Sequence, residues 1–300
     1  MGDVSISLDA SQLAATAKLF SSRVIQELAG KGKSPLFCRL AEESTLAGRI
    51  VGNAPIRELF ELAFSFLTKK IYRHEYAYKA AITHKLLLGV HSLHTASLLT
   101  EFRVGSCKAD IAILNGTSSV YEIKSERDRL DRLSAQIEAY RSVFANVNII
   151  AAEKHVPDIL CMVPEDVGIL VLTERFRIST IREACSDINR LDATVIFDSI
   201  TRREAVLILK MLNISVPSVP NTRIHGELRA IFSSLPVVDT HACMVAVLKE
   251  CRSLSSSTQF ISALPSSLRT AALSAKLHPK DHQRLLYAVE TPIGEALSWA

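Results

Sequence analysis

Apolar residues recur three or four positions apart through the first seventy residues, which is the spacing of amphipathic helices. The first helical stretch has Asp9 as a candidate N-cap and a stop at Gly30 and Gly32. Pro55 predicts the start of a later helix, because proline is favoured in the first helical turn. We therefore expect residues 1–70 to form an N-terminal helical region.

The pattern changes after residue 70. A helical segment is followed by three short β-type runs, a helix and a further strand, in the order α-β-β-β-α-β. The three early runs, contained in "SLLTEFRVGSCKADIAIL" and "SSVYEIK", lie too close together for crossover connections and predict an antiparallel meander. A helix and another strand pair follow. The fold class expected for residues 71–180 is α/β, with a central mixed sheet.

The remaining residues, 181–300, return to helical spacing and predict a C-terminal helical region. Ser199 is the candidate cap of one of its helices. A winged-helix or helix-turn-helix arrangement is an alternative for residues 198–252. Basic residues in this region could form a DNA-facing surface: Arg202, Arg203, Arg223, Arg229 and Lys249.

The amino-acid composition limits the classes of protein to which the chain could belong. Of the 300 residues, 48% are hydrophobic, which suits a folded chain with a large core, and the formal charge of +4 is too mild to indicate a polyanion-binding protein by itself. The six cysteines form no CxxC pair and no apolar signal segment follows Met1, so we expect a reducing cytoplasm and neither a zinc nor an iron–sulfur site. No run of eighteen apolar residues predicts a membrane span.

Ionisable residues end two of the predicted apolar strands, in the stretch "ADIAILNGTSSVYEIK". Glu122 and Lys124 share one face of their strand, because side chains alternate along a strand. A two-residue turn would leave Asp110 on the other face, whereas an odd loop, with a type I turn over Leu114 and Asn115 and a left-handed Gly116, brings it to the same face. We expect the odd loop and a shared face for the three groups.

Such a cluster is costly unless something binds it, because an unpaired buried carboxylate costs several kcal/mol. A divalent cation would compensate the two acids, and Mg²⁺ binds through one or two carboxylates while keeping several waters. The ammonium of Lys124 could then orient an attacking water. This chemistry suits phosphodiester hydrolysis.

The same residues resemble a known superfamily. An Asp ending one strand, Glu-x-Lys on the next and a following helix with a Q-x-x-x-Y spacing are similar to the restriction-endonuclease-like PD-(D/E)XK nucleases, in particular the RecB-like and lambda-exonuclease-like members. The context "YRHEYAYKAAI…KADIAI…VYEIKSERD…QIEAY" also resembles an uncharacterised bacterial family assigned to that superfamily. The resemblance covers roughly residues 70–180, and it implies the restriction-endonuclease-like α-β-β-β-α-β core with helical extensions at both ends.

The resemblance implies a role for each matching residue. Asp110, Glu122, the carbonyl of Ile123 and the helical acid Glu75 would be metal ligands, with Mg²⁺ or Mn²⁺ as the cofactor. Lys124 would be the catalytic lysine, and two residues of the following helix would position it or a DNA phosphate: Gln136 and Tyr140.

The match has two departures from the superfamily pattern, and Glu75 has three rivals as the helical acid: Glu58, Glu61 and Glu101. Ala109 replaces the proline of the superfamily pattern, which is not a ligand, and the cysteine cluster of some RecB-like relatives is missing. Glu101 competes with Glu75 for the helical-acid role, but we expect it to pair with Arg103 or Lys108. Three arginines after the motif are either DNA phosphate contacts or a solvated helical face: Arg127, Arg129 and Arg132.

The expected function is therefore a metal-dependent nuclease acting on DNA, with phage defence or DNA processing as its setting. An inactive nuclease-fold protein that binds nucleic acid or assembles a complex is the first alternative, and a helical interaction protein is the second. A serine hydrolase or nucleotide-driven motor is disfavoured, because G-x-S-x-G and P-loop motifs are absent. The sequence leaves open RNA as substrate, endo or exo cleavage, and a homodimer or a partner protein.

Overall fold

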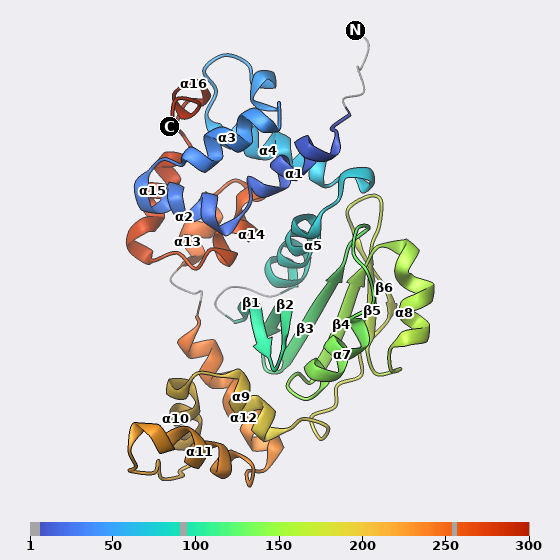
Figure 1. The fold of residues 1–300 in the computed structure, drawn as a ribbon, viewed down its shortest axis with the longest axis vertical. Coiled ribbons are helices and arrows are strands. Elements are labelled where there is room, and N and C mark those ends of the chain that lie inside the picture. The colour runs from blue at the N-terminus through green and yellow to red at the C-terminus, as the bar shows by residue number, and fades with distance from the viewer. Residues whose placement is uncertain (1–6, 91–94, 254–256, 300) are drawn as a thin grey trace. The chain divides into compact units, whose positions relative to one another are not determined.

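The computed structural model of the chain describes residues 7–90, 95–253 and 257–299 (Figure 1). Within these residues, no helix combines the length and the apolar character needed to cross a membrane.

The chain divides into two compact units. The terminal unit comprises residues 1–80 and 256–300, and the sheet unit comprises residues 81–255. The sequence predicted three consecutive regions, 1–70, 71–180 and 181–300, whereas the observed units join the two chain ends and place most of the predicted C-terminal region with the sheet.

The terminal unit is helical. Asp9 accepts a hydrogen bond from the Gln12 amide at 2.8 Å and caps the first helix, as predicted, and Gly32 ends the second helix with φ 74°. The two chain ends are joined by main-chain bonds, for example from Ile56 N to Thr291 O at 2.9 Å. Its helices are α1 (Ala10–Lys18), α2 (Ser22–Lys31), α3 (Pro35–Glu43), α4 (Ile56–Leu67), α13 (Thr258–Ala263), α14 (Ser266–Ser274), α15 (His282–Ala288) and α16 (Ile293–Ala296).

Helix α5 (Glu75–Ile82) begins in the terminal unit and is followed in the sheet unit by a π-helical stretch, Thr83–Leu87, and by α6 (Leu88–Val90). The α/β class predicted from the sequence is confirmed, because one six-stranded mixed sheet runs in the order β1-β2-β3-β4-β5-β6. Its strands are β1 (Ser97–Val104), β2 (Cys107–Leu114), β3 (Ser118–Lys124), β4 (Asn146–Ala151), β5 (Gly168–Leu172) and β6 (Ile178–Arg182).

The first three strands form the predicted antiparallel meander. Strands β3, β4 and β5 are parallel neighbours, connected through α7 (Leu133–Arg141) and α8 (Val156–Met162), while β6 returns antiparallel to β5 (Figure 1). The carboxyl ends of β3 and β4 therefore meet at the same edge of the sheet, which is where ligands bind in many α/β proteins.

The core of the sheet unit joins one sheet face to two groups of helices. Leu133 and Ile137 of α7 belong to the same buried cluster as Val120 and Ile149 of the sheet. Helices α9 and α12 contact β1 and β2, so the second half of the unit completes the core. These helices are α9 (Ala193–Ser199), α10 (Arg202–Met211), α11 (Asn221–Phe232) and α12 (Val237–Cys251).

The helices α9 to α12 are not a winged helix, because residues 183–253 contain no strand that could form the wing. The basic surface considered for this region is partly compensated. Arg229 makes a two-pronged ion pair with Asp198, at 3.1 to 3.2 Å, and Arg202 donates to the Asn221 side chain at 3.0 Å.

Candidate active site

The hairpin between β2 and β3 has the odd loop that the sequence predicted. Leu114 pairs with Ser118, which leaves the three-residue loop 115–117, and Gly116 is left-handed with φ 71°. The turn lies one residue later than expected, because Leu114 is fully buried in the strand instead of taking part in the turn. Continued by one residue beyond its last pair, Ile111–Tyr121, this register sets Asp110 opposite Glu122, which agrees with the predicted shared face.

The strands part at Asp110. The β2–β3 ladder ends at the pair Ile111–Tyr121, and the next β3 amide, Ile123 N, donates to the Asp110 side chain at 2.9 Å instead of to a neighbouring main chain. On the other side, the β1–β2 ladder skips the position of Glu101, whose φ of 57° is rare for a residue other than glycine. Local strain of this kind is found most often at functional sites.

Glu122 is the centre of a buried hydrogen-bond network. Its side chain is 3% exposed, and Oε1 accepts from Lys124 Nζ at 2.9 Å and from Gln136 Nε2 at 2.6 Å. Its other oxygen, Oε2, accepts from the Tyr140 hydroxyl at 3.0 Å. Lys124 also donates to Gln136 Oε1 at 2.9 Å, which closes the network between β3 and α7.

Helix α7 supplies the two polar partners because Gln136 and Tyr140 are four residues apart and share one face. Burial raises the pKa of the Tyr140 hydroxyl, and the negative charge of Glu122, its hydrogen bond and the charge of Asp110 raise it further. Tyr140 therefore stays a neutral donor at ordinary pH. The hydrogen bond from Tyr140 places the Glu122 carboxylate on the α7 side of the sheet.

Two other predicted acids have surface partners. Glu75, at the start of α5, forms an ion pair with Lys79 at 2.5 Å, and it belongs to the terminal unit. The cluster on β2, β3 and α7 is thus built without Glu75, whose metal role stays a prediction. Glu101 pairs with Lys108 at 3.2 Å, which confirms the structural partner expected for it.

The three arginines proposed as phosphate contacts are all exposed. Arg129 pairs with Asp131 at 2.8 Å, the kind of compensation that a solvated surface predicts. Both residues are more than half exposed, so this pair contributes little to stability and could be exchanged for a phosphate contact.

Residues outside the predicted site hold the chain in place after Lys124. Asp128 accepts hydrogen bonds from the Ser125 amide and hydroxyl, at 2.7 and 2.5 Å. His155 contacts the Ser125 carbonyl through Nε2 at 3.1 Å, and Ala152 N donates to Lys124 O at 2.8 Å. The predicted β-α-β connection could have indicated His155, because segments that follow two neighbouring parallel strands meet at one edge.

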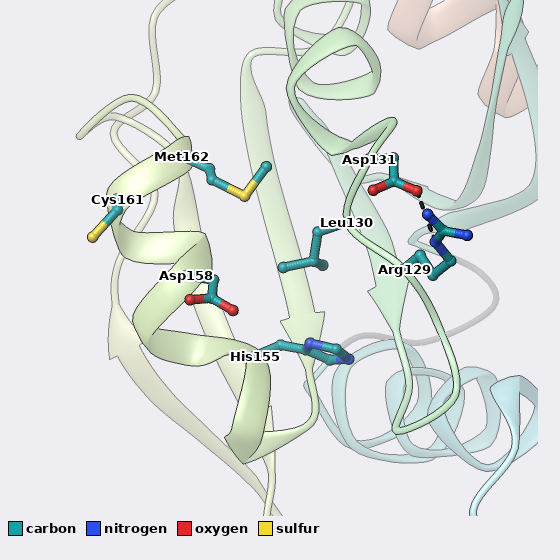
Figure 2. A pocket seen from close by; sticks show the side chains of 7 residues that line it. All are labelled: Arg129, Leu130, Asp131, His155, Asp158, Cys161 and Met162. Atoms are coloured by element: carbon teal, nitrogen blue, oxygen red, sulfur yellow. Dashed lines mark ion pairs between the residues drawn. The ribbon is translucent and has the colours of Figure 1, made fainter.

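A groove of about 520 Å³ lies beside this edge. Figure 2 shows α8 on one side and the loop before α7 on the other, with Met162 and Leu130 extending toward each other. The groove is lined by Arg129, Leu130, Asp131, His155, Asp158, Cys161 and Met162. His155 joins the groove to the cluster, since it contacts the residue that follows Lys124.

The donor set restricts which metal the site could take. Among the described residues, no three His, Cys, Asp or Glu side chains are grouped as a metal site. Two carboxylates, those of Asp110 and Glu122, suit Mg²⁺ or Mn²⁺ with mostly water ligands and do not suit a structural zinc. Glu122 has an acceptor site left for an ion on Oε2, because a carboxylate offers about four lone-pair sites and three donors are bound to it within the described residues.

Fold and site together define a mixed α/β protein with a partly buried cluster of acids, lysine, amide and phenol at the edge of its sheet. The chain belongs to the family described as Bacteriophage P4 protein cII, whose family model matches residues 68–277. One relative is Protein cII of Enterobacteria phage P4, which is 34% identical over 105 residues. That match covers 33% of this chain and 40% of the relative. No solved structure matches the chain.

Proposed function

We propose that the protein is a metal-dependent nuclease of the PD-(D/E)XK type that hydrolyses phosphodiester bonds of DNA. The observation that carries the proposal is the gathering of Asp110, Glu122, Lys124, Gln136 and Tyr140 where β2 and β3 part. A buried ion pair is weak support for stability and could often be replaced by apolar residues. Clusters of this kind are therefore candidates for chemistry.

The element order supports the same proposal. Helix α5, strands β1 to β3, helix α7 and strand β4 follow one another as α-β-β-β-α-β, the order of the proposed nuclease core. The Q-x-x-x-Y helix faces the Glu-x-Lys strand through three hydrogen bonds among four side chains, a relation that sequence spacing alone does not guarantee. The proposal rests on these side chains more than on the fold, because one fold hosts many functions.

In the proposed reaction, Asp110 and Glu122 would hold Mg²⁺ or Mn²⁺, with the Ile123 carbonyl as a further candidate ligand. The ion would polarise the phosphodiester and help ionise a water. Lys124 has three N–H bonds, and within the described residues two of them go to Glu122 and Gln136. The third is available for a phosphate oxygen or the attacking water. Gln136 and Tyr140 fix the carboxylate and the ammonium in place.

The DNA strand would lie along the carboxyl ends of β3 and β4, beside the groove of Figure 2. Arg127 and Arg132 are exposed near the same edge and would contact phosphates, and Arg129 would do so by leaving Asp131. Phage defence or DNA processing is the proposed setting, in a reducing cytoplasm. A homodimer or a partner protein would be needed only if the protein cuts both strands of a DNA duplex.

The test compares wild type with Lys124→Ala on linear, circular and single-stranded DNA and on RNA, with Mg²⁺, Mn²⁺ or EDTA. We expect wild type to cut DNA only with a divalent ion and Lys124→Ala to lose cleavage while keeping DNA binding. Lys210→Ala, an exposed lysine on α10 outside the network and the groove, is the matched control and should cut normally. Metal-independent cleavage, or equal cleavage by Lys124→Ala, would refute the proposal.

One observation favours the alternative of an inactive nuclease-fold protein. Both Glu122 oxygens are engaged by three donors, so the cluster is satisfied without a metal. This alternative predicts no cleavage with any divalent ion and no rise in melting temperature on adding Mg²⁺ or Mn²⁺, because a ligand of the folded state raises that temperature. Nucleic-acid binding would survive in both wild type and Lys124→Ala.

A further inference from the structure

The net positive charge of the chain is confined to one of its two units. Residues 1–80 and 256–300 contain fifteen Lys and Arg against eleven Asp and Glu, whereas residues 81–255 contain twenty of each. The whole formal charge of +4 therefore belongs to the terminal unit, which is not the unit that carries the proposed active site. Local excess charge is a better guide to polyanion binding than the average over a chain.

Part of this charge lines a groove between α2 and α3. The groove has a volume of about 550 Å³ and is lined by Arg23, Glu27, Lys31, Pro35, Leu36 and Arg39. Arg23, Glu27 and Lys31 follow each other at intervals of four residues, so they form one row along α2. The two cations of that row are eight residues apart, which spans about 12 Å of helix.

The one acid of the groove is already engaged. Glu27 accepts a hydrogen bond from the Ser34 hydroxyl at 2.6 Å and from Arg23 Nε at 3.1 Å. Ser34 also caps α3 by accepting from Phe37 N at 2.9 Å. Glu27 therefore fixes the turn between the two helices, and its charge is balanced by Arg23.

Two cationic side chains of the groove are available to contact a ligand. Lys31 is exposed and makes no ion pair among the residues that the structure describes. Arg39 is 68% exposed and its contact with Glu43 is long, at 3.6 Å, so little free energy holds it there. A ligand with spaced negative charges could contact both without breaking a buried interaction.

We propose that the groove between α2 and α3 binds the phosphodiester backbone of nucleic acid through Lys31 and Arg39. The choice of nucleic acid rests on the proposed function, in either its catalytic or its inactive form. The groove is open, its cations are spread over two neighbouring helices, and its apolar lining is limited to Pro35 and Leu36. These features suit a repeating backbone and sequence-independent contact.

The test measures binding of DNA and of RNA of the same sequence by fluorescence anisotropy, in EDTA, at 50 to 200 mM salt, on a Lys124→Ala background. The groove variant is Lys31→Gln with Arg39→Gln. The control is Arg49→Gln with Lys276→Gln, which removes the same charge from exposed positions of the same unit outside the groove. Circular dichroism and melting curves check that both variants fold.

We expect the groove variant to bind about tenfold more weakly at low salt and its salt dependence, the slope of log K against log salt, to shrink by about 1.8 for two lost phosphate contacts. The control should keep the slope of the parent. Equal slopes for groove variant and control would overturn the proposal. If only one of the two polymers responds to the groove variant, that polymer is the ligand of the groove.

The outcome is separable from the nuclease proposal because binding is measured without metal and without turnover. In the wild-type background, the groove variant should raise the KM for DNA and leave kcat unchanged, since neither residue touches the proposed reacting groups. If wild type never cuts DNA but the groove variant still loses its salt slope, the groove proposal stands and the inactive alternative is favoured.

Discussion

Lys124 and Glu122 depend on each other because both are buried. Their side chains are 8% and 3% exposed, and their contact is 2.9 Å. We predict that Glu122→Gln lowers the free energy of unfolding by about 3–5 kcal/mol, because it leaves an ammonium buried without its counter-charge. Urea unfolding of the two proteins at neutral pH measures this difference.

The double variant Glu122→Gln with Lys124→Met is the control for that prediction. Removing the second charge should restore much of the lost stability, because no buried ion is then left unpaired. If the double variant is as unstable as the sum of the single variants, the pair is not coupled and the buried-network description is wrong.

For individual residues, the sequence predicted which side chains lie near each other but not which hydrogen bonds they form. Period-two alternation and the odd loop placed Asp110, Glu122 and Lys124 on one face, and helical spacing joined Gln136 to Tyr140. The closed network around Glu122 was not predicted. It depends on the distance between β3 and α7, which is set by core packing and not by either segment alone.

At the scale of elements, Gly168 controls how closely β4 and β5 pack. A Cβ atom at this position would lie 2.4 Å from Asn148 Oδ1 and 2.9 Å from Ala184 N. Asn148 is held by a hydrogen bond to Val120 O at 3.3 Å, and the Ala184 contact is main chain. We predict that Gly168→Ala destabilises the protein by about 1–3 kcal/mol, the usual cost of overpacking, measured by thermal or urea unfolding.

Gly226 provides the matched control. It lies within α11 and a Cβ atom there would meet nothing within 4 Å. Gly226→Ala should therefore stabilise the protein by up to about 1 kcal/mol, because alanine is the better helix former. If both substitutions change the free energy of unfolding in the same direction, the proposed overpacking at Gly168 is wrong.

A second element contact, between β3 and α12, predicts a pH dependence. His241 is 3% exposed and its Nε2 lies 2.8 Å from the Ser118 hydroxyl. Burial lowers the pKa of His241, so the folded protein resists a proton that the unfolded chain accepts below its ordinary pKa of about 6.5. Stability should therefore be highest above that pH and fall as the pH decreases below it.

The measurement is the free energy of unfolding at pH 7.5 and 5.5 for wild type and His241→Gln. Other groups that titrate in this range are shared by both proteins. The change in the free energy of unfolding between the two pH values therefore differs between the proteins only by the contribution of the His241 imidazole. We expect the free energy of unfolding to decrease less between pH 7.5 and pH 5.5 in His241→Gln than in wild type. An equal decrease in the two proteins would show that His241 has a similar pKa in the folded and the unfolded states.

Element boundaries were predicted best where a local signal was decisive. Asp9 caps α1 as expected, because its side chain reaches the Gln12 amide. The cap predicted at Ser199 is wrong, since Thr201 and Glu204 form a reciprocal capping box at the start of α10. Ser199 instead ends α9 and donates to Val195 O at 2.7 Å.

At the scale of the whole molecule, the sequence predicted the order of helices and strands but not how the chain divides. Helical periodicity shows which face of a helix is apolar and not which helix covers it. The terminal unit depends on contacts between chain ends more than 200 residues apart, such as Gln26 Nε2 to Ala275 O at 2.9 Å. No local pattern signals such pairings.

This discontinuous unit predicts a local response to shortening the chain. Arg284, on α15, donates to the Ala29 and Gly30 carbonyls at the end of α2, and Thr291 O accepts from Ile56 N at the start of α4. Deletion of residues 282–300 removes all of these contacts. We expect amide hydrogen exchange to accelerate strongly in α2 and α4, because local stability follows local contacts.

The strands β3 and β4 should keep their protection in the shortened chain, since their hydrogen bonds lie within residues 81–255. Arg284→Ala in the full-length chain is the milder control, and it should affect the end of α2 while leaving α4 unchanged. Exchange resolved by mass spectrometry separates these segments. An equal loss of protection in β3, β4 and α2 would mean that the two units unfold as one, and the division of the chain would then have no thermodynamic meaning.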